Sequence, residues 1–181
     1  SSDVCSSDLV EKGGRAQKYY SSVEWLIRAD IVSICKRVTD IRYDLNDYAR
    51  DDFFRLYVSD MSLLSAMRDF SMKQQIVENI FSGNTKGGLY ETAIANVLYK
   101  KGYETFFYKN DSSQKEIDFI IQKEGKVIPI EVKSSNSKAT SLNNIVSKCD
   151  NIEVAYKFID GNMGRANNGV ITAPLHAVMF L

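Results

Sequence analysis

Two acids and a lysine lie beside the apolar runs of the stretch EIDFIIQKEGKVIPIEVK, at residues 116–133. The stretch is typical of two β-strands joined by a turn, and valine or threonine would pack better than Asp118, Glu131 and Lys133. A buried charge costs free energy unless it is paired or bound to a ligand. These three side chains are therefore candidates for chemistry.

The register of this hairpin decides whether the two acids meet. Glu124-Gly125 is the turn signal within the stretch. A two-residue turn there gives a ladder of apolar pairs, whereas a three-residue loop would place Ile117 opposite Glu131. Because register follows the hydrophobic pattern, we expect the two-residue turn. The expected pairs are Ile121–Ile128, Phe119–Ile130 and Ile117–Val132, all on one face.

In that register Asp118 lies directly opposite Glu131, and Lys133 follows two residues along on the same face. Opposed side chains have Cβ atoms about 4.5–5.5 Å apart, and like charges at that spacing destabilise a sheet. Two carboxylates held so close favour a bound cation. Their oxygens suit Mg²⁺, which takes one or two protein carboxylates and leaves its other positions to water and substrate phosphate.

A third acid is predicted to join them from a helix that follows Gly88. On this helix Glu91 shares a face with Ile94, Ala95 and Leu98. That face should pack against the sheet, where a lone carboxylate is costly unless it is paired or bound to metal.

The residues before this helix predict a small module of their own. Helical spacing after Ser21 or Ser22, a β-like run over 31–38 and a returning strand over 53–60 indicate a winged-helix-like module within 15–85. A generic α+β layer without a DNA role explains the same pattern equally well.

The remaining pattern alternates helices and strands, which predicts an α/β (α+β) fold. Two serine-capped helices are expected between 59 and 81, then a loop over 82–88 that lacks the phosphate-cradling G-x-x-x-x-G-K-[ST] pattern. The expected elements after it are a helix over 89–102, a strand over 103–108, the hairpin, a helix over 141–149, a strand over 152–159 and a final strand over 173–181.

The charge, cysteine and hydrophobic content of the chain count against several classes of function. Lys+Arg and Asp+Glu are equal at 23 each, which counts against a non-specific nucleic-acid coat but not against a local site. The three cysteines are too widely spaced for a disulfide framework or a zinc site, which favours a reducing cytoplasm. No apolar run approaches the roughly 20 residues of a membrane span, so no membrane partner is expected.

An acid on a helix followed by Asp-x12-Glu-x-Lys across a hairpin resembles the PD-(D/E)XK nuclease superfamily. The resemblance implies a restriction-endonuclease-like mixed sheet flanked by helices over 86–181, with DNA as substrate and Mg²⁺ or Mn²⁺ as cofactor. Asp118, Glu131 and the carbonyl of Val132 would hold the metal, Glu91 would support it directly or through water, and Lys133 would orient the attacking water. Ile117 replaces the proline of the motif name, which supplies no ligand.

A longer resemblance covers nearly all of the chain after residue 9. The stretches VEWLIRADIV, RLYVSDMSLLSAM and GGLYETAIANVLYKKGYETFFY, with the hairpin, look like the C-terminal domain of unknown function (family 4143) of bacterial and archaeal AAA-type ATP-binding proteins. This implies a preceding ATPase domain, which would bind the ATP and through which oligomers would form. Tyr108-Lys109 stand where such proteins often have an aromatic residue followed by arginine.

The first nine residues, SSDVCSSDL, repeat Ser-Ser-Asp without helical or strand periodicity. We interpret 1–9 as a non-native, adapter-derived scar, with a disordered tail as the alternative. Two hypotheses on function follow: a Mg²⁺-dependent endonuclease, or a non-catalytic docking or DNA-sensing module for the missing ATPase domain. Retention of all four polar residues favours the first, and neutral net charge favours the second.

Overall fold

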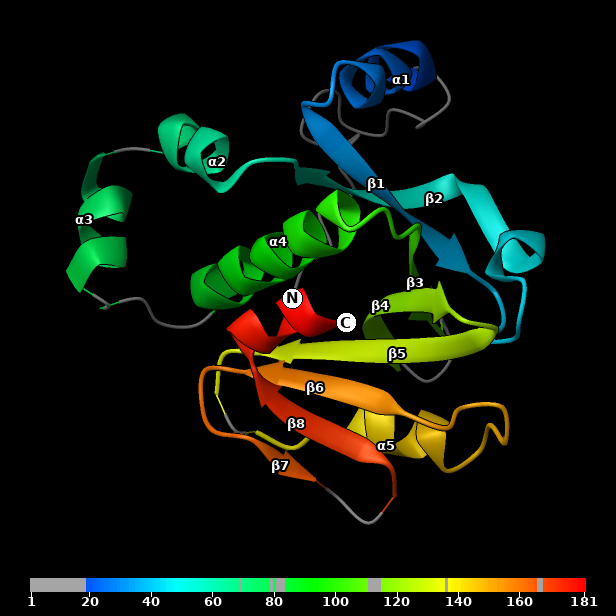
Figure 1. The fold of residues 1–181 in the computed structure, drawn as a ribbon. Helices are drawn as coiled ribbons and strands as arrows, with labels where there is room; N and C mark the ends of the chain where they lie inside the picture. Colours follow the sequence, from blue (N-terminus) through cyan, green and yellow to red (C-terminus); the bar gives the residue numbers. More distant parts are fainter. Residues whose placement is uncertain are drawn as a thin grey trace.

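A computed structural model describes residues 19–68, 70–78, 80, 84–110, 115–135, 137–165 and 168–181. The proposed scar at 1–9 lies outside these residues. The described residues form one mixed sheet of eight strands in the order β2-β1-β3-β4-β5-β6-β8-β7 (Figure 1). The strands are β1 Val32–Val38, β2 Ala49–Val58, β3 Thr105–Lys109, β4 Glu116–Lys123, β5 Lys126–Lys133, β6 Ala155–Ile159, β7 Gly164–Arg165 and β8 Val170–Pro174.

Helices cover both faces of the sheet, which confirms the predicted α/β class (Figure 1). The α-helices are α1 Tyr20–Arg28, α2 Met61–Met67, α3 Phe70–Glu78, α4 Asn84–Lys100 and α5 Thr140–Val146. Two 3-10 helices span Leu45–Tyr48 and Leu175–Phe180.

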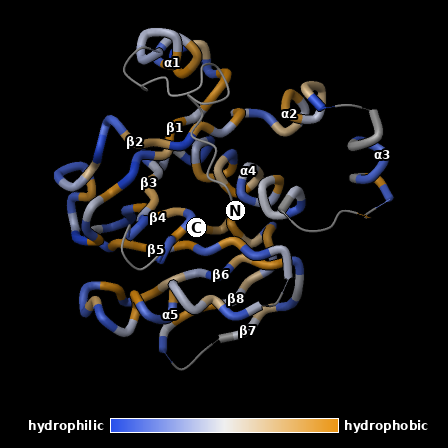
Figure 2. Tube along the Cα trace, turned by 180° about the vertical axis from the view of Figure 1, so that it is seen from behind, coloured by the Kyte–Doolittle hydropathy of each residue, from blue (hydrophilic) through white to orange (hydrophobic). Residues whose placement is uncertain are grey.

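Two apolar clusters form the core, one on each side of the sheet. In the first, Ile94 and Leu98 of α4 pack against strand residues such as Phe119 and Ile130. In the second, Leu142 and Ile145 of α5 pack against the other side. Figure 2 shows hydrophobic residues along the central strands of the sheet. Among the described residues, no helix combines the length and apolar character needed to cross a bilayer.

The predicted hairpin register is confirmed along its apolar part. The β4–β5 ladder runs from Lys123–Lys126 through Ile121–Ile128 to Phe119–Ile130. Glu124 and Gly125 form the two-residue turn, with φ of 51° and 77°. Positive φ at both positions is the conformation that fits the right-handed twist of the two strands.

One part of the face prediction was wrong. Phe119, Ile130 and Val132 pack in the α4-side cluster, whereas Ile117 packs in the α5-side cluster, so these four residues do not share a face. The cause is a bulge in β4: Tyr108 pairs with Ile117 but Phe106 pairs with Ile120, which leaves two β4 residues opposite one β3 residue. The extra residue shifts the alternation of side chains within β4.

The segment 15–85 contributes directly to the common sheet. The expected helix and two strands are present as α1, β1 and β2, and β1 pairs in parallel with β3. This continuity differs from a winged-helix-like module that would precede the nuclease-like fold. The β-branched and aromatic residues of β1 and β2 complete the sheet edge beside β3.

Two further elements differ from the sequence prediction. The loop expected over 82–88 is in part the first turn of α4. The Nζ of Lys86 lies 3.0 Å from the Oδ2 of Asp160, and the hydroxyl of Tyr90 donates a 2.9 Å hydrogen bond to the same oxygen. These contacts hold the glycine-rich turn in helical form. The final strand ends at Pro174, and the 3-10 helix that follows packs Val178 into the α4-side cluster.

Candidate active site

The predicted site residues gather at the open end of the β4–β5 hairpin, immediately beyond the Phe119–Ile130 pair. Asp118 comes from β4, Glu131, Val132 and Lys133 from the end of β5, and Glu91 from the first half of α4. The carboxyl ends of the parallel strands β6 and β8 lie at the same end of the sheet. Open α/β sheets commonly place their ligand sites at this edge.

The bulge in β4 positions Asp118. Because Ile117 faces the α5 side, alternation turns Asp118 toward the α4 side. Glu131 lies between Ile130 and Val132, which both pack in the α4-side cluster, so the same alternation turns Glu131 to the other face. The β4–β5 ladder ends at Phe119–Ile130, and the prediction that Asp118 and Glu131 form a cross-strand pair on one face was wrong.

One carboxylate oxygen of Asp118, Oδ2, accepts a 2.7 Å hydrogen bond from the backbone N–H of Val132. Burial raises the pKa of Asp118, and this hydrogen bond, with the charges of Lys133 and Arg55, acts in the opposite direction.

Glu131 is the most buried of the predicted acids, with 5% of its side chain exposed. Its Oε1 lies 2.5 Å from the Nζ of Lys133, whereas its Oε2 is buried with no hydrogen-bond partner among the described residues. Burial, followed by the charge of Asp118, raises the pKa of Glu131 to about 7. An unsatisfied buried carboxylate oxygen is costly, so this position is a candidate for ligand binding.

Glu91 lies one turn before Ile94 and Ala95, which pack in the α4-side cluster. Burial and then the charge of Asp118 raise the pKa of Glu91 to about 7, while Arg55 and Lys133 lower it. The charge of Asp118 therefore acts on both Glu91 and Glu131. Perturbed carboxylates of this kind concentrate at functional sites, although structural clusters also produce them.

Sequence reasoning missed Arg55, which reaches this cluster from β2. Its guanidinium forms an ion pair with Glu116 and lies 4.2 Å from the ring centroid of Phe107. Its charge lowers the pKa of both Glu91 and Asp118. An arginine in the middle of the apolar run FFRLYV is the same kind of anomaly as the acids in the hairpin, and it was the available signal.

The donor set fits a hydrated divalent cation only in part. Within the described part of the chain, no group of three or more His, Cys, Asp or Glu side chains is already arranged to hold a metal ion. One oxygen of Asp118 and one of Glu131 are engaged by Val132 and Lys133. The remaining Oε2 of Glu131 suits Mg²⁺, which keeps several waters and takes one or two protein carboxylates.

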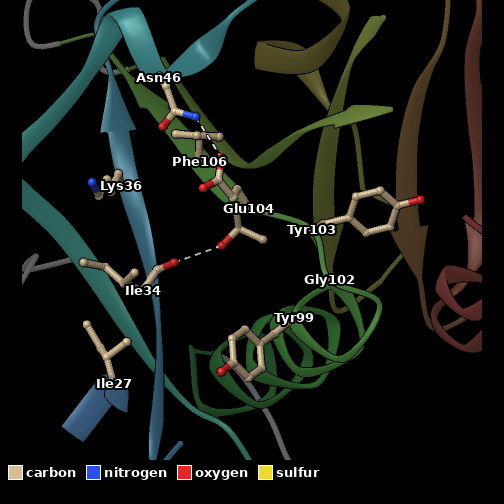
Figure 3. Close-up of a pocket in the computed structure, with 10 residues that line it drawn as sticks. Ile27, Ile34, Lys36, Asn46, Tyr99, Gly102, Tyr103, Glu104 and Phe106 are labelled. Carbon is tan, nitrogen blue, oxygen red and sulfur yellow. Dashed lines mark hydrogen bonds between the residues drawn. The ribbon is translucent and has the colours of Figure 1, made fainter. Parts of the chain in front are cut away.

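The pocket in Figure 3 lies elsewhere, between α1, β1 and the end of α4. It measures about 240 Å³, and no predicted site residue lines it. Its polar groups pair with one another: Asn46 donates to Glu104 at 2.8 Å and Thr105 donates to the Ile34 carbonyl at 3.2 Å. Because these polar groups are already paired with one another, they do not mark the pocket as a ligand site.

The described cysteines and the single histidine of the chain are not among the acid-cluster residues. Cys35 is fully buried, and burial raises its pKa to about 12, as expected of a small core residue. Cys149 is half-buried. His176 lies on the C-terminal 3-10 helix and not on the predicted strand.

Comparison with known proteins identifies one family. The family described as Domain of unknown function (DUF4143) matches residues 86–176, half of the chain. This range begins at the predicted boundary of the second domain and contains Glu91, Asp118, Glu131 and Lys133, but not Arg55. A comparison with curated proteins finds no match. The chain belongs to the DUF4143 family.

Proposed function

We propose that this protein is a Mg²⁺-dependent endonuclease that hydrolyses phosphodiester bonds in DNA. The observation that supports the proposal is the buried Oε2 of Glu131, which has no hydrogen-bond partner in the described part of the chain and belongs to a side chain that lies beside Lys133 and is influenced by the charge of Asp118. The metal-free fold keeps these acids together at a cost in stability. Binding of a cation would offset that cost.

Each residue has a separate role in this proposal. Asp118, Glu131 and the carbonyl of Val132 would hold the metal, with Glu91 in support. When bound, the metal would polarise the phosphoryl oxygen and stabilise the charge that develops in the transition state. Lys133 would orient the attacking water, because its ammonium donates hydrogen bonds and is already anchored on Glu131.

Plasmid nicking by the purified protein tests the proposal. Conversion of supercoiled to open-circular DNA is expected with Mg²⁺ or Mn²⁺ and not with EDTA, and Lys133→Ala should abolish it. Lys126→Ala is the matched control, since Lys126 also forms a 2.5 Å ion pair with a glutamate, Glu153, but at the surface. Absence of nicking by the parent protein with either metal would contradict the proposal.

A docking module for an ATP-binding domain is the second candidate. Exposed apolar side chains on and beside α2 and α3 favour it: Met67 is 68% exposed, Val77 85% and Ile80 60%. In Figure 1 these helices extend away from the sheet. Such side chains mark contact surfaces when they gather in one region.

A further inference from the structure

The edge strand β2 contains an irregularity close to the acid cluster. Lys36 pairs with Phe54, but the next β1 residue, Arg37, pairs with Arg50. Three β2 residues, 51–53, are therefore inserted between successive rungs of the ladder. Bulges of this kind occur at sheet edges and beside active sites, where they redirect side chains.

The bulge presents Phe53 at the surface in a fixed setting. The side chain is 45% exposed, and the guanidinium of Arg37 lies 5.1 Å from its ring centroid. Arg37 is itself anchored by a 2.6 Å hydrogen bond to the Lys109 carbonyl. The ring of Phe53 also lies 6.3 Å from that of Phe107, tilted by 44°.

These contacts continue from Phe53 to the acid cluster. On the other side of Phe53's neighbour Phe107, the guanidinium of Arg55 lies 4.2 Å from the Phe107 ring centroid. Phe107 is also the β3 residue that faces the bulge of β4, where Asp118 is located. A row of contacts, from the guanidinium of Arg37 through the rings of Phe53 and Phe107 to the guanidinium of Arg55, thus leads from an exposed aromatic side chain toward the carboxylates.

The charge along this row is positive. Four cations border it: Arg37, Arg50, Arg55 and Lys109. Two acids lie among them, and each is paired. Asp52 lies 3.0 Å from Arg50, and Glu116 pairs with Arg55. The excess of cations is suited to a polyanion.

We propose that Phe53 and Arg37 bind an unpaired nucleobase, so that the substrate is a nucleic-acid strand with exposed bases. This inference rests on the proposed nuclease function. Aromatic side chains stack on unpaired bases of any sequence, and a neighbouring arginine adds a cation–π contribution and a phosphate contact. A base inside an intact duplex offers no free face to Phe53, so duplex DNA gains only from the cations.

Binding measured without metal separates this inference from catalysis. The probe is a fluorescein-labelled oligothymidylate of about 20 nucleotides, longer than the ~4–16 nucleotides of typical single-strand sites. Fluorescence anisotropy in EDTA at one fixed salt concentration gives its affinity, and a duplex of equal length serves for comparison. Phe53→Ala should weaken single-strand binding about 5- to 100-fold, the range for loss of one stacked base, and leave duplex binding unchanged.

Two further variants test whether the ring itself is responsible. Phe53→Trp should retain single-strand affinity, because indole stacks at least as well as phenyl. Trp25→Ala is the matched control, since Trp25 is an exposed aromatic residue (63%) on α1 that contributes nothing to the row. Failure of the parent protein to bind the oligothymidylate, or an equal loss of duplex binding in Phe53→Ala, would overturn the inference.

The two proposals fail separately. Phe53-dependent binding of the oligothymidylate without plasmid nicking would retain this inference and remove the nuclease proposal. Nicking by the parent protein, together with unchanged oligothymidylate affinity in Phe53→Ala, would retain the nuclease proposal and remove this inference.

Discussion

The two ends of the β4–β5 hairpin have the same backbone pairing but opposite chemistry. At the turn end, apolar pairs and a two-residue turn with positive φ favour the observed fold. At the open end, the charge of Asp118 raises the pKa of Glu131, whose Oε2 lacks a hydrogen-bond partner among the residues that the structure describes. A chain selected only for stability would have apolar residues at both ends. This contrast supports the proposal that the open end holds a ligand.

The largest expected effect concerns Lys133 at the open end. Lys133→Ala should lower the rate of DNA cleavage by about 10²–10⁴-fold, the usual contribution of a group that assists proton transfer. Mg²⁺ affinity should remain largely intact, because lysine supplies no ligand. Isothermal titration with Mg²⁺ at pH 8.5 and single-turnover cleavage measure the two quantities. A parallel loss of Mg²⁺ affinity would argue against this division of roles.

The next effect is the pH dependence of stability. Burial and the charge of Asp118 raise the pKa of Glu131 to about 7 from an ordinary value of 4.5. Between these values the folded state holds more protons than the unfolded state, so the metal-free protein should lose stability as pH rises toward 7. Glu131→Gln should therefore stabilise it at pH 8 by about 1–3 kcal/mol, since one pKa unit corresponds to about 1.4 kcal/mol. At pH 4 the variant and the parent should match.

Urea denaturation in EDTA across this pH range measures the effect. Glu153→Gln removes one negative charge from an exposed ion pair and serves as the control. If the stability of Glu131→Gln changed with pH in parallel with that of the parent, the charge of Glu131 would already be compensated by its neighbours in the folded state.

A smaller effect is expected at the turn end. Gly125 has a φ of 77°, and no atom lies within 4 Å of an added Cβ, so Gly125→Ala should cost about 1–2 kcal/mol through backbone strain alone. Gly88, inside α4, has equally open surroundings, and Gly88→Ala should instead stabilise by about 0.5–1 kcal/mol. Thermal melts of the two variants and the parent measure these changes in stability. The added stability from Mg²⁺ should be the same in both variants as in the parent, because neither touches the open end.

Sequence reasoning succeeded where one local pattern determined the structure. The apolar pairs of the hairpin specified its register, and the face shared by Glu91 and Ile94 specified the orientation of α4. It failed where contacts between distant segments determine the structure. The bulge in β4 depends on pairing with β3, and the inclusion of β1 in the sheet depends on a parallel contact with β3. The anomaly of Arg55 in FFRLYV was visible in the sequence, but its position near the acids depends on the pairing of β2 with β1.

The smallest effect tests the open end most directly. Asp118→Asn keeps the shape of the side chain, and its amide oxygen can still accept the N–H of Val132. Because burial raises the pKa of Asp118, loss of its charge removes an unfavourable burial. At pH 8 in EDTA we expect the variant to be as stable as the parent or more stable by about 0.5–1 kcal/mol, the scale of one side-chain pair in a sheet.

Millimolar Mg²⁺ should reverse this order in thermal melts. A ligand that binds only the folded state stabilises it by mass action, so the parent should gain stability and Asp118→Asn should lose most of that gain. Asp160→Asn is the matched control: contacts with Lys86 and Tyr90 lower the pKa of Asp160, so its neutralisation should destabilise the protein and leave the Mg²⁺ gain intact. A parent indifferent to Mg²⁺, with Asp118→Asn clearly less stable in EDTA, would make Asp118 a structural residue. The two ends of the hairpin would then serve folding alike, and the docking module would be the better description of this domain.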